Sequence, residues 1–596
     1  MKKRLIKILA VVSATLLALS LTACDPRVRV DPQPNPKPRP WPRPYPYDDV
    51  KTSIYVSNYE GGYGRVWLDN AIDRFEEKYQ NYEFEPGSGK KGVRIYVDSS
   101  INGKTGEEFI KYAKNSDYHV IFTEDTFYYD LVNKYGAGAD ISDIVNAPLN
   151  GEFWDDFNQQ PKSIASKMPS EVQNFFGVKS SEGTKYYALP HYFDCTALYY
   201  DIDLFDNFGF WLKEDGTFLG EDPSYKKAVA LGEADKNDYP LSKGIDGDNG
   251  TEFDGLPATY DEFFKLLDYM IERGVDPIHT YGGGGPVDGY LYNAWAQNEG
   301  RQSITKLFKP TGVSNRLNDS VDEDGNITML PSDTQVDGKN IQAQLGKYQA
   351  VQLGKRLAQG DFDSPYYFYD EAFAPYLSSV LAEGTYLYSS YEEMPIAMYM
   401  GRISWENQAT ESLWFEDAPL GRYERKFGVL PVPFADESYL DGNQKWTIVS
   451  DCNLSLSFIN ANLQEDPNKA GVLDAAKKFL QFLHTDEELQ NFSVQTSGFK
   501  PFNYPITYEN KAYMSCYGEQ VLSLTSNPNV DIVYTFTNAE HYLDNYAYYY
   551  PTDIGWGGYS IITEFFNKPD KTAVELFFEI KTAKNSAWDS SLEKTE

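Results

Sequence analysis

Residues 54–64 read IYVSNYEGGYG, a short run of β-favouring residues that passes into a polar, glycine-rich loop. The segment that follows, about 65–79, is expected to be a helix. Its apolar residues recur at four-residue steps along one face: Trp67, Ala71 and Phe75. A strand, a loop and an amphipathic helix in this order are the start of a β-α-β unit.

The next segments repeat the same alternation. Residues 93–97 and 119–122 have the composition of buried strands, and a helix is expected between them over 107–114. Strands that alternate with helices pair in parallel and carry the helices on the faces of the sheet. The stretch therefore predicts an α/β fold.

Two later segments carry clear secondary-structure signals. Thr259 and Glu262 have the spacing of a capping box, and Gly274 is placed to end the helix that they begin. Another helix is expected over 467–483. Between 453 and 459 apolar residues alternate with polar ones, which predicts a half-exposed strand.

The first 24 residues, MKKRLIKILAVVSATLLALSLTAC, predict export. A basic start precedes the uncharged run 8–21, which is shorter than the about 20 apolar residues of a spanning helix and ends in small residues like a cleaved signal. The sequence LTAC at 21–24 resembles the lipobox of bacterial lipoproteins. That resemblance implies that Cys24 is acylated and becomes the mature N-terminus. An ordinary secretory signal with a chance cysteine is the alternative.

Residues 26–46 are rich in proline and cannot build a packed core. Polyproline II rises about 3.1 Å per residue, so residues 25–47 could hold a domain up to roughly 70 Å from a membrane. The run is locally basic, and basic residues near an anionic membrane surface are attracted to it. We interpret it as a stalk, with a ligand for a proline-reading domain as the alternative.

Composition limits what the remaining residues can be. Residues 48–596 are too many to pack around a single hydrophobic core, which predicts two large lobes. The chain has 88 acidic against 54 basic residues and a net charge of −34, which excludes an electrostatic nucleic-acid footprint. No second apolar run approaches spanning length. The 15% aromatic content suggests, besides core packing, a surface for stacking.

The cysteines form no metal motif. After Cys24 only Cys195, Cys452 and Cys516 remain, an odd count without ligand spacing. We expect buried free thiols, and stability that comes from the size of the core.

Seven segments in order resemble the carbohydrate-binding, maltose-binding-protein-like group of extracytoplasmic solute-binding proteins of ABC importers. They span roughly residues 53–505. The segments are IYVSNYEGGYG (54–64), DYHVIFTED (117–125), YYALPHYFDCTALYYDIDLF (186–205), LPATYDEFFKLLDYMIERGVDPI (256–278), IAMYMGRISW (396–405), KFGVLPVP (426–433) and AAKKFLQFLHTDEELQNFSVQTSGFKPFN (475–503). The polar insertions at 209–250 and 310–340 and the tyrosine-rich tail after 506 depart from the compact members.

The resemblance implies a two-lobe, type II periplasmic-binding-protein fold, with a cleft and a hinge that the chain crosses more than once. Residues 1–23 would be the signal peptide and 24–49 the lipidated cysteine and linker. The N-lobe would comprise 50–193 plus 433–505, and the C-lobe 194–432 plus 506–596. The first two crossings would lie at 190–195 and 429–433.

A sugar-binding cleft needs aromatic rings for the C–H faces of the sugar and carboxylates or amides for its hydroxyls. In open α/β sheets such sites lie at the carboxyl ends of the strands. The loops expected there hold Tyr59, Glu60, Glu124 and Asp125. Tyr63 lies in the first of these loops and is a weaker candidate.

The resemblance adds further candidates. It places His191 and Asp194 at the hinge, and Trp405 as a platform that stacks on sugar. Trp405→Ala is accordingly expected to weaken binding ten- to about a hundredfold with little loss of fold. Further candidates from the residues themselves are Tyr290, which ends the glycine-rich loop 281–290, and Trp556 in the C-terminal segment.

Each candidate also has a structural alternative. Loop carboxylates usually face solvent or cap helices, and aromatic residues usually pack in a core. Trp295 is interpreted as a core residue. Two aspartate groups could suggest calcium, but they lack EF-hand spacing and are interpreted as turn residues: Asp246, Asp248 and Asp254, and Asp322 and Asp324.

The sequence thus predicts a lipid-anchored, monomeric receptor on the outer face of the cell membrane. It would capture a carbohydrate, an oligosaccharide by its aromatic content, and deliver it to an ABC permease without catalysis, cofactor, metal or nucleic acid. The alternatives are an exported glycoside hydrolase, which needs a carboxylate pair about 5–9.5 Å apart, and the same fold with a non-sugar ligand such as a peptide. An adhesion protein would show repeats, which are absent from the sequence.

Overall fold

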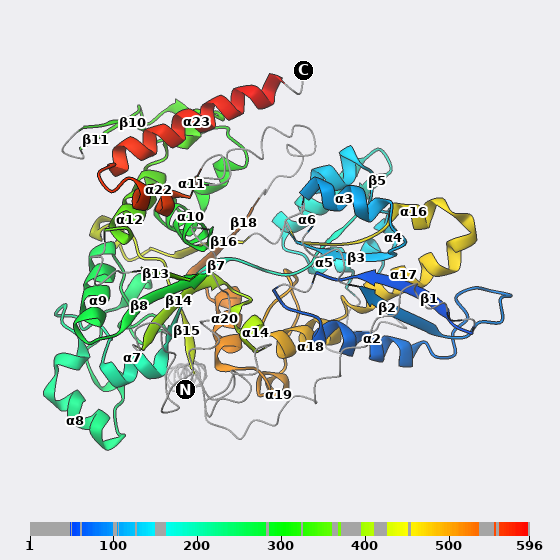
Figure 1. Cartoon of the computed structure of the whole chain (residues 1–596), viewed down its shortest axis with the longest axis horizontal. Coiled ribbons are helices and arrows are strands. Elements are labelled where there is room, and N and C mark those ends of the chain that lie inside the picture. The colour runs from blue at the N-terminus through cyan, green and yellow to red at the C-terminus, as the bar shows by residue number, and fades with distance from the viewer. Residues whose placement is uncertain are drawn as a thin grey trace, which may run out of the picture.

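The computed structural model describes residues 48, 50–59, 62–98, 104, 106–124, 128–149, 162–281, 285–322, 326–359, 367–370, 395–410, 426–450, 455–535, 554–555 and 560–593. The expected signal peptide, Cys24 with its expected acyl group, and the proline-rich linker lie outside these residues. Figure 1 shows two groups of elements, each built around its own sheet.

The first lobe has a five-stranded sheet in the order β2-β1-β3-β17-β6. Its strands are β1 (Thr52–Ser57), β2 (Val93–Asp98), β3 (Val120–Thr123), β6 (Leu189–Pro190) and β17 (Leu456–Ile459). Strand β1 pairs in parallel with both β2 and β3, which confirms the arrangement predicted from the first β-α-β stretch. Strand β17 runs antiparallel to β3 and β6 and makes the sheet mixed.

Strand β17 is fully buried, so the prediction of a half-exposed strand at 453–459 was wrong. It lies between β3 and β6, and neighbouring elements cover both of its faces. Its polar residue Ser457 is accommodated because the Oγ atom donates a hydrogen bond of 3.4 Å to the carbonyl of Leu189. The sequence pattern therefore predicted a serine that faces solvent, whereas in the structure its hydroxyl finds a hydrogen-bond acceptor inside the protein.

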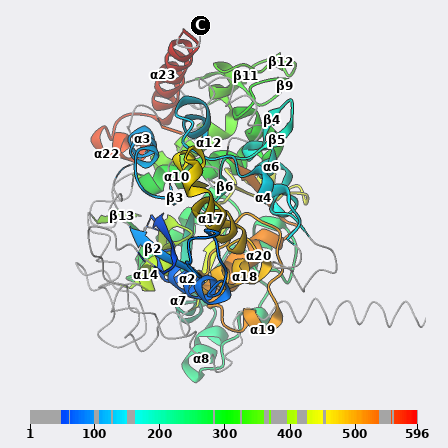
Figure 2. The same ribbon diagram turned by 90° about the vertical axis from the view of Figure 1, so that its right-hand side faces the viewer.

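Helices cover the first sheet, and they include those predicted at about 65–79, 107–114 and 467–483. The longer ones are α2 (Val66–Lys78), α3 (Gly106–Lys114), α17 (Ala470–Phe482) and α18 (Asp486–Thr496). Shorter ones are α4 (Ser142–Asn146), α5 (Ile164–Lys167), α6 (Ser170–Phe176) and α16 (Ala461–Glu465). Helix α17 packs on β1 and α2 on β2, while α18 packs on α2. In Figure 2 this lobe faces the viewer, with α17 in front.

The second lobe has another five-stranded sheet, in the order β13-β8-β14-β7-β15. Its strands are β7 (Thr196–Asp201), β8 (Asp276–Tyr281), β13 (Tyr367–Asp370), β14 (Ile396–Arg402) and β15 (Phe427–Leu430). Strands β13, β8 and β14 are mutually parallel, and β7 runs antiparallel to β14 and β15. Each sheet therefore mixes a parallel group with antiparallel strands.

The helices of the second lobe include α9 (Tyr260–Glu272), whose predicted capping box is confirmed. The others are α7 (Ile202–Phe208), α8 (Pro223–Leu231), α10 (Gly285–Glu299), α11 (Arg301–Ile304), α12 (Leu345–Leu357), α14 (Trp405–Thr410), α22 (Ile561–Asn567) and α23 (Ala573–Glu593). Helices α19 (Tyr508–Lys511) and α20 (Cys516–Ser526) follow α18 in the chain. Helix α23 packs on α12 at the top of Figure 1.

The two polar insertions form no further domain among the described residues. Residues 209–250 contribute α8 and short turns of 3₁₀ helix. Residues 310–340 form two-stranded ribbons, which pair β10 with β11 and β12 with β9. The strands are β9 (Val313–Ser314), β10 (Asn318–Val321), β11 (Ile327–Met329) and β12 (Thr334–Gln335).

Strand β16 (Trp446–Ser450) belongs with the second lobe, although the sequence had assigned 433–505 to the first. Its backbone N–H groups at Thr447 and Val449 donate to the side-chain oxygens of Gln297 and Asn293 on α10, at 2.6 and 2.8 Å. It also pairs in parallel with β18 (Val530–Tyr534). The chain returns to the first sheet at β17 (Leu456–Ile459).

The cysteines divide into two states. Cys195 is buried and forms no disulfide bond, as expected. Cys516, at the start of α20, is disulfide-bonded, so the expectation of a free thiol was wrong there. Its partner lies outside the described residues.

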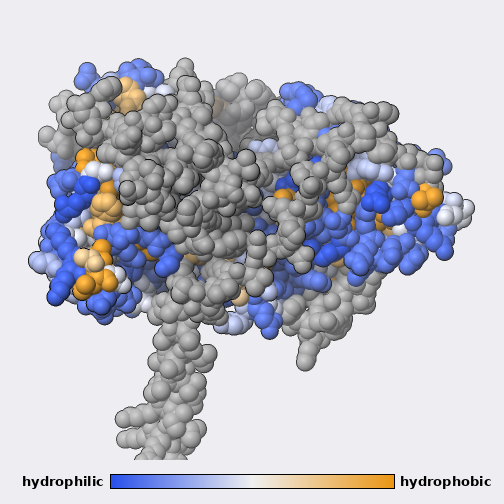
Figure 3. All heavy atoms as spheres, turned by 60° about the horizontal axis from the view of Figure 1, so that its bottom comes forward, coloured by the Kyte–Doolittle hydropathy of each residue, from blue (hydrophilic) through white to orange (hydrophobic). Residues whose placement is uncertain are grey.

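The hydrophobic core has two parts. A large cluster fills the first lobe and most of the second. A smaller, strongly aromatic cluster lies where the first crossing segment meets the second sheet, and it includes Phe193, Tyr199, Trp405, Phe427 and Tyr517. None of the helices in the described part of the chain has the length and apolarity that a membrane crossing needs. On the face in Figure 3 the coloured residues are mostly hydrophilic, with small separate hydrophobic groups.

Candidate functional site

The carboxyl ends of the parallel strands in the first lobe carry the first part of the candidate site. Residues 58–59 follow β1, and Glu124 follows β3. Because β1 and β3 are parallel neighbours, both loops leave the same edge of the sheet. The Glu124 side chain is only 6% exposed, so a charged group is held at this edge inside the protein.

A salt bridge joins this edge to the second lobe. Nη1 of Arg402, the last residue of β14, donates a hydrogen bond of 2.8 Å to Oδ2 of Asp194, and it lies 3.8 Å from Oε2 of Glu124. The side chains of Arg402 and Asp194 are 34% and 3% exposed. One guanidinium therefore lies between two nearly buried carboxylates, one from the first lobe and one from the first crossing. We call Arg402, Asp194 and Glu124 the junction triad.

Gly62 permits the close approach of the loop after β1 to this triad. Its φ is +64°, and a Cβ atom there would lie 2.9 Å from Glu124 Oε1 and 3.1 Å from the Tyr192 hydroxyl. A side chain would collide with both groups and would be strained in this conformation. The carbonyl of Gly62 in turn accepts a hydrogen bond of 3.4 Å from Asn407 Nδ2, at the start of α14.

Tyr192 brings a hydroxyl group to the junction. The residue is buried, and within the described part of the chain its OH group has no hydrogen-bond partner. Its ring packs edge-on against Tyr63, at 4.7 Å between centroids. Tyr63 is fixed because its own hydroxyl donates a hydrogen bond of 3.3 Å to the carbonyl of Phe193. Aromatic rings, a hydroxyl and charged groups thus converge where the two lobes meet.

His191 lies in the core beside the junction. Its ring contacts Trp67, Phe122 and Tyr192, at 4.8 to 5.6 Å between centroids. Nζ of Lys500 lies 3.1 Å from its Nδ1 atom and donates to its carbonyl at 2.8 Å. Burial, and then the charge of Lys500, hold the pKa of His191 well below its ordinary value. A neutral imidazole in an aromatic core suits a positioning role more than a ligand contact.

Trp405 lies in the aromatic cluster of the second lobe and is 2% exposed. Its ring stacks on Tyr199, at 5.4 Å between centroids and 19° between planes, and meets Phe427 edge-on at 5.0 Å. The expectation that Trp405→Ala would leave the fold nearly unaffected does not fit this packing, because loss of a buried tryptophan costs about 3–5 kcal/mol. Its role as a sugar platform stays a prediction.

The other aromatic candidates in the second lobe lie on α10. Tyr290 is fully buried, and burial raises the pKa of its phenol well above the ordinary value. Trp295 is also fully buried, and its Nε1 donates to Gln344 Oε1 at 2.8 Å, which confirms its interpretation as a core residue. Neither residue is among those that meet at the junction triad.

Three of the predicted site residues lie outside the described residues: Glu60, Asp125 and Trp556. Tyr59 is described and half-buried at the end of the loop that precedes Gly62. Of the residues predicted from the sequence, the structure brings together Asp194 and Glu124, with His191 in the adjacent core.

Sequence reasoning missed Arg402, Tyr192 and Lys500. Each lies inside a segment that carried the family resemblance, at 396–405, 186–205 or 475–503. Arg402 carried a usable signal, because it is the one charged residue in the apolar run IAMYMGRISW. A charge at the carboxyl end of a buried strand marks a ligand-binding edge of an α/β sheet.

The aspartates weighed for calcium accept hydrogen bonds from turns. Asp254 Oδ2 accepts from the N–H of Gly250 at 2.7 Å, and Asp322 Oδ1 accepts from that of Asn326 at 2.7 Å. In the described part of the chain no group of three or more potential metal-ligating side chains is close enough to hold an ion.

No protein-family model matches the sequence, and no curated protein does. Among solved structures, a chitin oligosaccharide binding protein matches with a TM-score of 0.50 and 10% identity, over 90% of this chain and 99% of that one. The chain has the two-lobed fold of a solute-binding protein. Its solute-binding fold also matches maltose-bound MalE3 of T. maritima, with a TM-score of 0.47 and 14% identity, over 90% of this chain and 99% of that one. Raffinose-bound RafE matches with a TM-score of 0.47 and 10% identity, over 90% and 100%.

Proposed function

We propose that this protein is the extracytoplasmic receptor of an ABC importer and that it captures a carbohydrate between its lobes. The observation that carries the proposal is the junction triad. Arg402, Asp194 and Glu124 come from the second lobe, the first crossing and the first lobe, and they meet at strand ends. A ligand that contacts all three would couple its own binding to the relative position of the lobes.

The chemistry at the junction suits a sugar. Carboxylates and a guanidinium form charge-assisted hydrogen bonds with hydroxyl groups, and the Tyr192 hydroxyl can serve as a further donor or acceptor. The rings of Tyr63 and Tyr192 supply an apolar surface beside them. The chitin oligosaccharide binding protein of the same fold is named for an oligosaccharide, which supports this ligand class.

We propose distinct roles for the predicted site residues. Asp194 and Glu124 contact the ligand, together with the neighbouring loop residues Tyr59, Glu60 and Asp125, and Trp556 contributes a platform. The buried residues Trp405, Tyr290 and His191 position the site from within the core. Closure of the lobes follows the hinge motion of binding proteins. The sugar favours the closed state only by the difference between its affinities for the closed and the open state.

We also propose that Cys24 carries the lipid anchor and that the chain works as a monomer with membrane permease subunits. The disulfide at Cys516 supports an extracytoplasmic position, because disulfides persist in oxidising compartments. Mass spectrometry of the mature N-terminus checks the anchor. An acyl group on Cys24, and release of a Cys24→Ser variant from the membrane fraction, are the expected results.

Calorimetric titration with maltooligosaccharides, chitooligosaccharides and raffinose tests the ligand class. We expect one series to bind, and Asp194→Asn to weaken that binding by about tenfold or more, because a hydrogen bond to a charged group contributes about 1.5–3 kcal/mol. The matched control is Asp117→Asn, an exposed aspartate of the first lobe. Equal binding by both variants would contradict the role of the triad.

The same protein separates the alternatives. Labelled oligosaccharide should be recovered intact after incubation, whereas cleavage that is lost in Glu124→Gln or Asp194→Asn would indicate a glycoside hydrolase. A peptide library tested by thermal shift covers the non-sugar alternative, because a ligand of the native state raises the melting temperature.

A further inference from the structure

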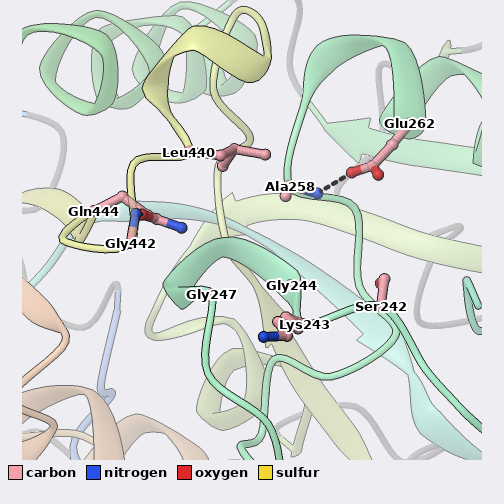
Figure 4. Close-up of a pocket in the computed structure, with 9 residues that line it drawn as sticks. All are labelled: Ser242, Lys243, Gly244, Gly247, Ala258, Glu262, Leu440, Gly442 and Gln444. Carbon is pink, nitrogen blue, oxygen red and sulfur yellow. Dashed lines mark hydrogen bonds between the residues drawn. The ribbon is translucent and has the colours of Figure 1, made fainter. Parts of the chain in front are cut away.

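A pocket lies in the second lobe and shares no residue with the junction triad. It has a volume of about 280 Å³ and is formed by three segments of the chain. The segments are the end of the polar insertion at 242–247, the start of α9 with Ala258 and Glu262, and the loop 440–444. Figure 4 shows side chains from all three segments around a common space.

Backbone hydrogen bonds hold the first wall in place. The N–H of Ser242 donates to the carbonyl of Leu212 at 2.9 Å, and its carbonyl accepts from the N–H of Gly255 at 2.8 Å. The insertion is thereby fixed against the body of the lobe on both sides of Ser242.

The other two walls are joined to each other. The N–H of Tyr260 donates to the carbonyl of Phe434 at 2.8 Å, and the N–H of Phe434 donates to that of Ala258 at 2.9 Å. The Tyr439 ring stacks on Phe434, at 5.3 Å between centroids and 5° between planes. These contacts anchor the loop that carries Leu440 and Gln444, so the pocket is formed before any ligand arrives.

Gly247 keeps room for a polar group in this pocket. Its φ is +72°, and a Cβ atom there would lie 2.7 Å from Gln444 Nε2. The orientation of the Gln444 amide is fixed because its Oε1 accepts a hydrogen bond of 2.6 Å from the N–H of Gly442. In Figure 4 the amide nitrogen points toward the middle of the pocket, where it can donate.

The remaining lining residues supply groups of every kind that a sugar needs. The Ser242 hydroxyl is shielded from solvent and has no hydrogen-bond partner among the residues that the structure describes. Oε2 of Glu262 accepts from the N–H groups of Ala258 and Thr259, at 2.7 and 3.2 Å, which fixes the carboxylate at the rim. Lys243 adds a cation and Leu440 an apolar face.

The balance of these groups points to an uncharged ligand. One lysine and one glutamate give the lining no net charge, and the chain carries −34 overall, which disfavours anions. Donors, acceptors and the apolar side chains of Leu440 and Ala258 match a ring of hydroxyl groups with a C–H face. We propose that this pocket binds one neutral monosaccharide unit, independently of the junction triad and of the function proposed for it.

Ligand-observed saturation-transfer NMR on the full chain tests the proposal. The probes are D-glucose, D-galactose, D-mannose and N-acetylglucosamine, with zwitterionic leucine and dianionic succinate as competitors of similar size. The measurements use an Arg402→Ala background, which disables the junction site, and two added variants. Gln444→Leu removes the amide from the pocket, and Asn443→Leu makes a similar change at the exposed neighbour that does not line it.

We expect at least one sugar to bind the Arg402→Ala protein. Gln444→Leu should weaken that binding about tenfold, whereas Asn443→Leu should leave it unchanged. Absence of sugar binding, equal binding by both leucine variants, or binding of leucine or succinate in place of the sugars would each overturn the proposal. Melting curves confirm that each variant is folded. If the unaltered chain bound no carbohydrate at the junction, that result would contradict the proposed receptor function. It would leave the proposal for this pocket untouched.

Discussion

Nη1 of Arg402 lies 2.8 Å from Oδ2 of Asp194, and this hydrogen bond ties the end of β14 to the segment by which the chain first leaves the first lobe. The Asp194 side chain is nearly buried, whereas the Arg402 side chain keeps about a third of its surface exposed. A ligand that enters the junction can therefore reach the arginine while the aspartate holds it in place.

Arg402→Ala should lower the free energy of unfolding by about 1–3 kcal/mol, because it removes a hydrogen bond between charged groups beside two nearly buried carboxylates. Chemical denaturation measures this. The matched control is Arg356→Ala, whose partner Asp261 is at the surface and 89% exposed. Such surface pairs contribute about 0–1 kcal/mol. A loss no larger than that of the control would show that the junction salt bridge does not stabilise the fold.

Trp405→Ala should destabilise the protein by about 3–5 kcal/mol, because the ring fills a space between Tyr199 and Phe427 in the aromatic cluster. Trp405→Phe keeps an aromatic ring there and should cost less. Denaturant titration followed by circular dichroism gives both values. A Trp405→Ala protein of unchanged stability but weaker sugar binding would restore the stacking role predicted from the sequence.

The free energy of unfolding should rise with pH above neutrality because of Lys500. Burial lowers the pKa of Lys500 from 10.5 to about 7 in the folded protein. Between these two values the unfolded chain binds a proton that the folded protein does not, so each step up in pH favours folding. Below about pH 7 Lys500 is charged in the folded protein, and burial of this charge destabilises the fold in full. The destabilisation disappears as the pH approaches 10.5, the pKa of Lys500 in the unfolded chain.

Comparison with Lys500→Met isolates this contribution from those of Lys584 and Lys236, whose pKa values burial also lowers, to about 7 and about 8. From pH 7.5 to 9 the stability of the unaltered chain should rise more steeply than that of Lys500→Met, by about 1 kcal/mol per pH unit. The same change at the exposed Lys91 should leave the slope as it is. Parallel curves for Lys500→Met and the unaltered chain would contradict the predicted titration.

Reduction should destabilise the protein through Cys516. Loss of a native disulfide typically costs about 2–5 kcal/mol, so Cys516→Ser and a reducing agent should lower the melting temperature to a similar extent. Cys195→Ser is the control, because Cys195 is buried and forms no disulfide bond. Thiol labelling of the denatured, unreduced chain should modify Cys195 and not Cys516. Labelling of both, with no effect of reductant, would show that Cys516 is free in solution.

Much of the fold was predictable because its signals are local. The helix at 66–78 and the capping box at Thr259 follow from periodicity and from residues within one turn of each other. The parallel pairing of β1 with β2 and β3 follows from the alternation of strands and helices. The burial of β17 was not predictable, because it depends on β6, which lies more than 260 residues away in the sequence. A serine that faces solvent and one that bonds a distant carbonyl look the same in a sequence.

The candidate site divides in the same way. Glu124 and Asp194 were identified from their places at a strand end and in a crossing segment, whereas Arg402 was missed. Its importance lies in its distance to two residues that are 208 and 278 positions earlier in the chain, a relationship that no local pattern records. Trp405 differs, because its place in a family-like segment predicted stacking on sugar, and only the structure revealed that its ring packs in a buried aromatic cluster.

The sequence by itself determined an α/β alternation and residues of the kinds that bind sugars, and it predicts an export signal, since each of these depends on residue type and short-range spacing. Only the tertiary structure decided which of those residues meet. Packing brought Arg402 between Asp194 and Glu124, enclosed Trp405 and His191, and built the pocket at 242–247 from an insertion and a distant loop. Charge and shape complementarity act through distances in space, and the order of residues along the chain does not fix those distances.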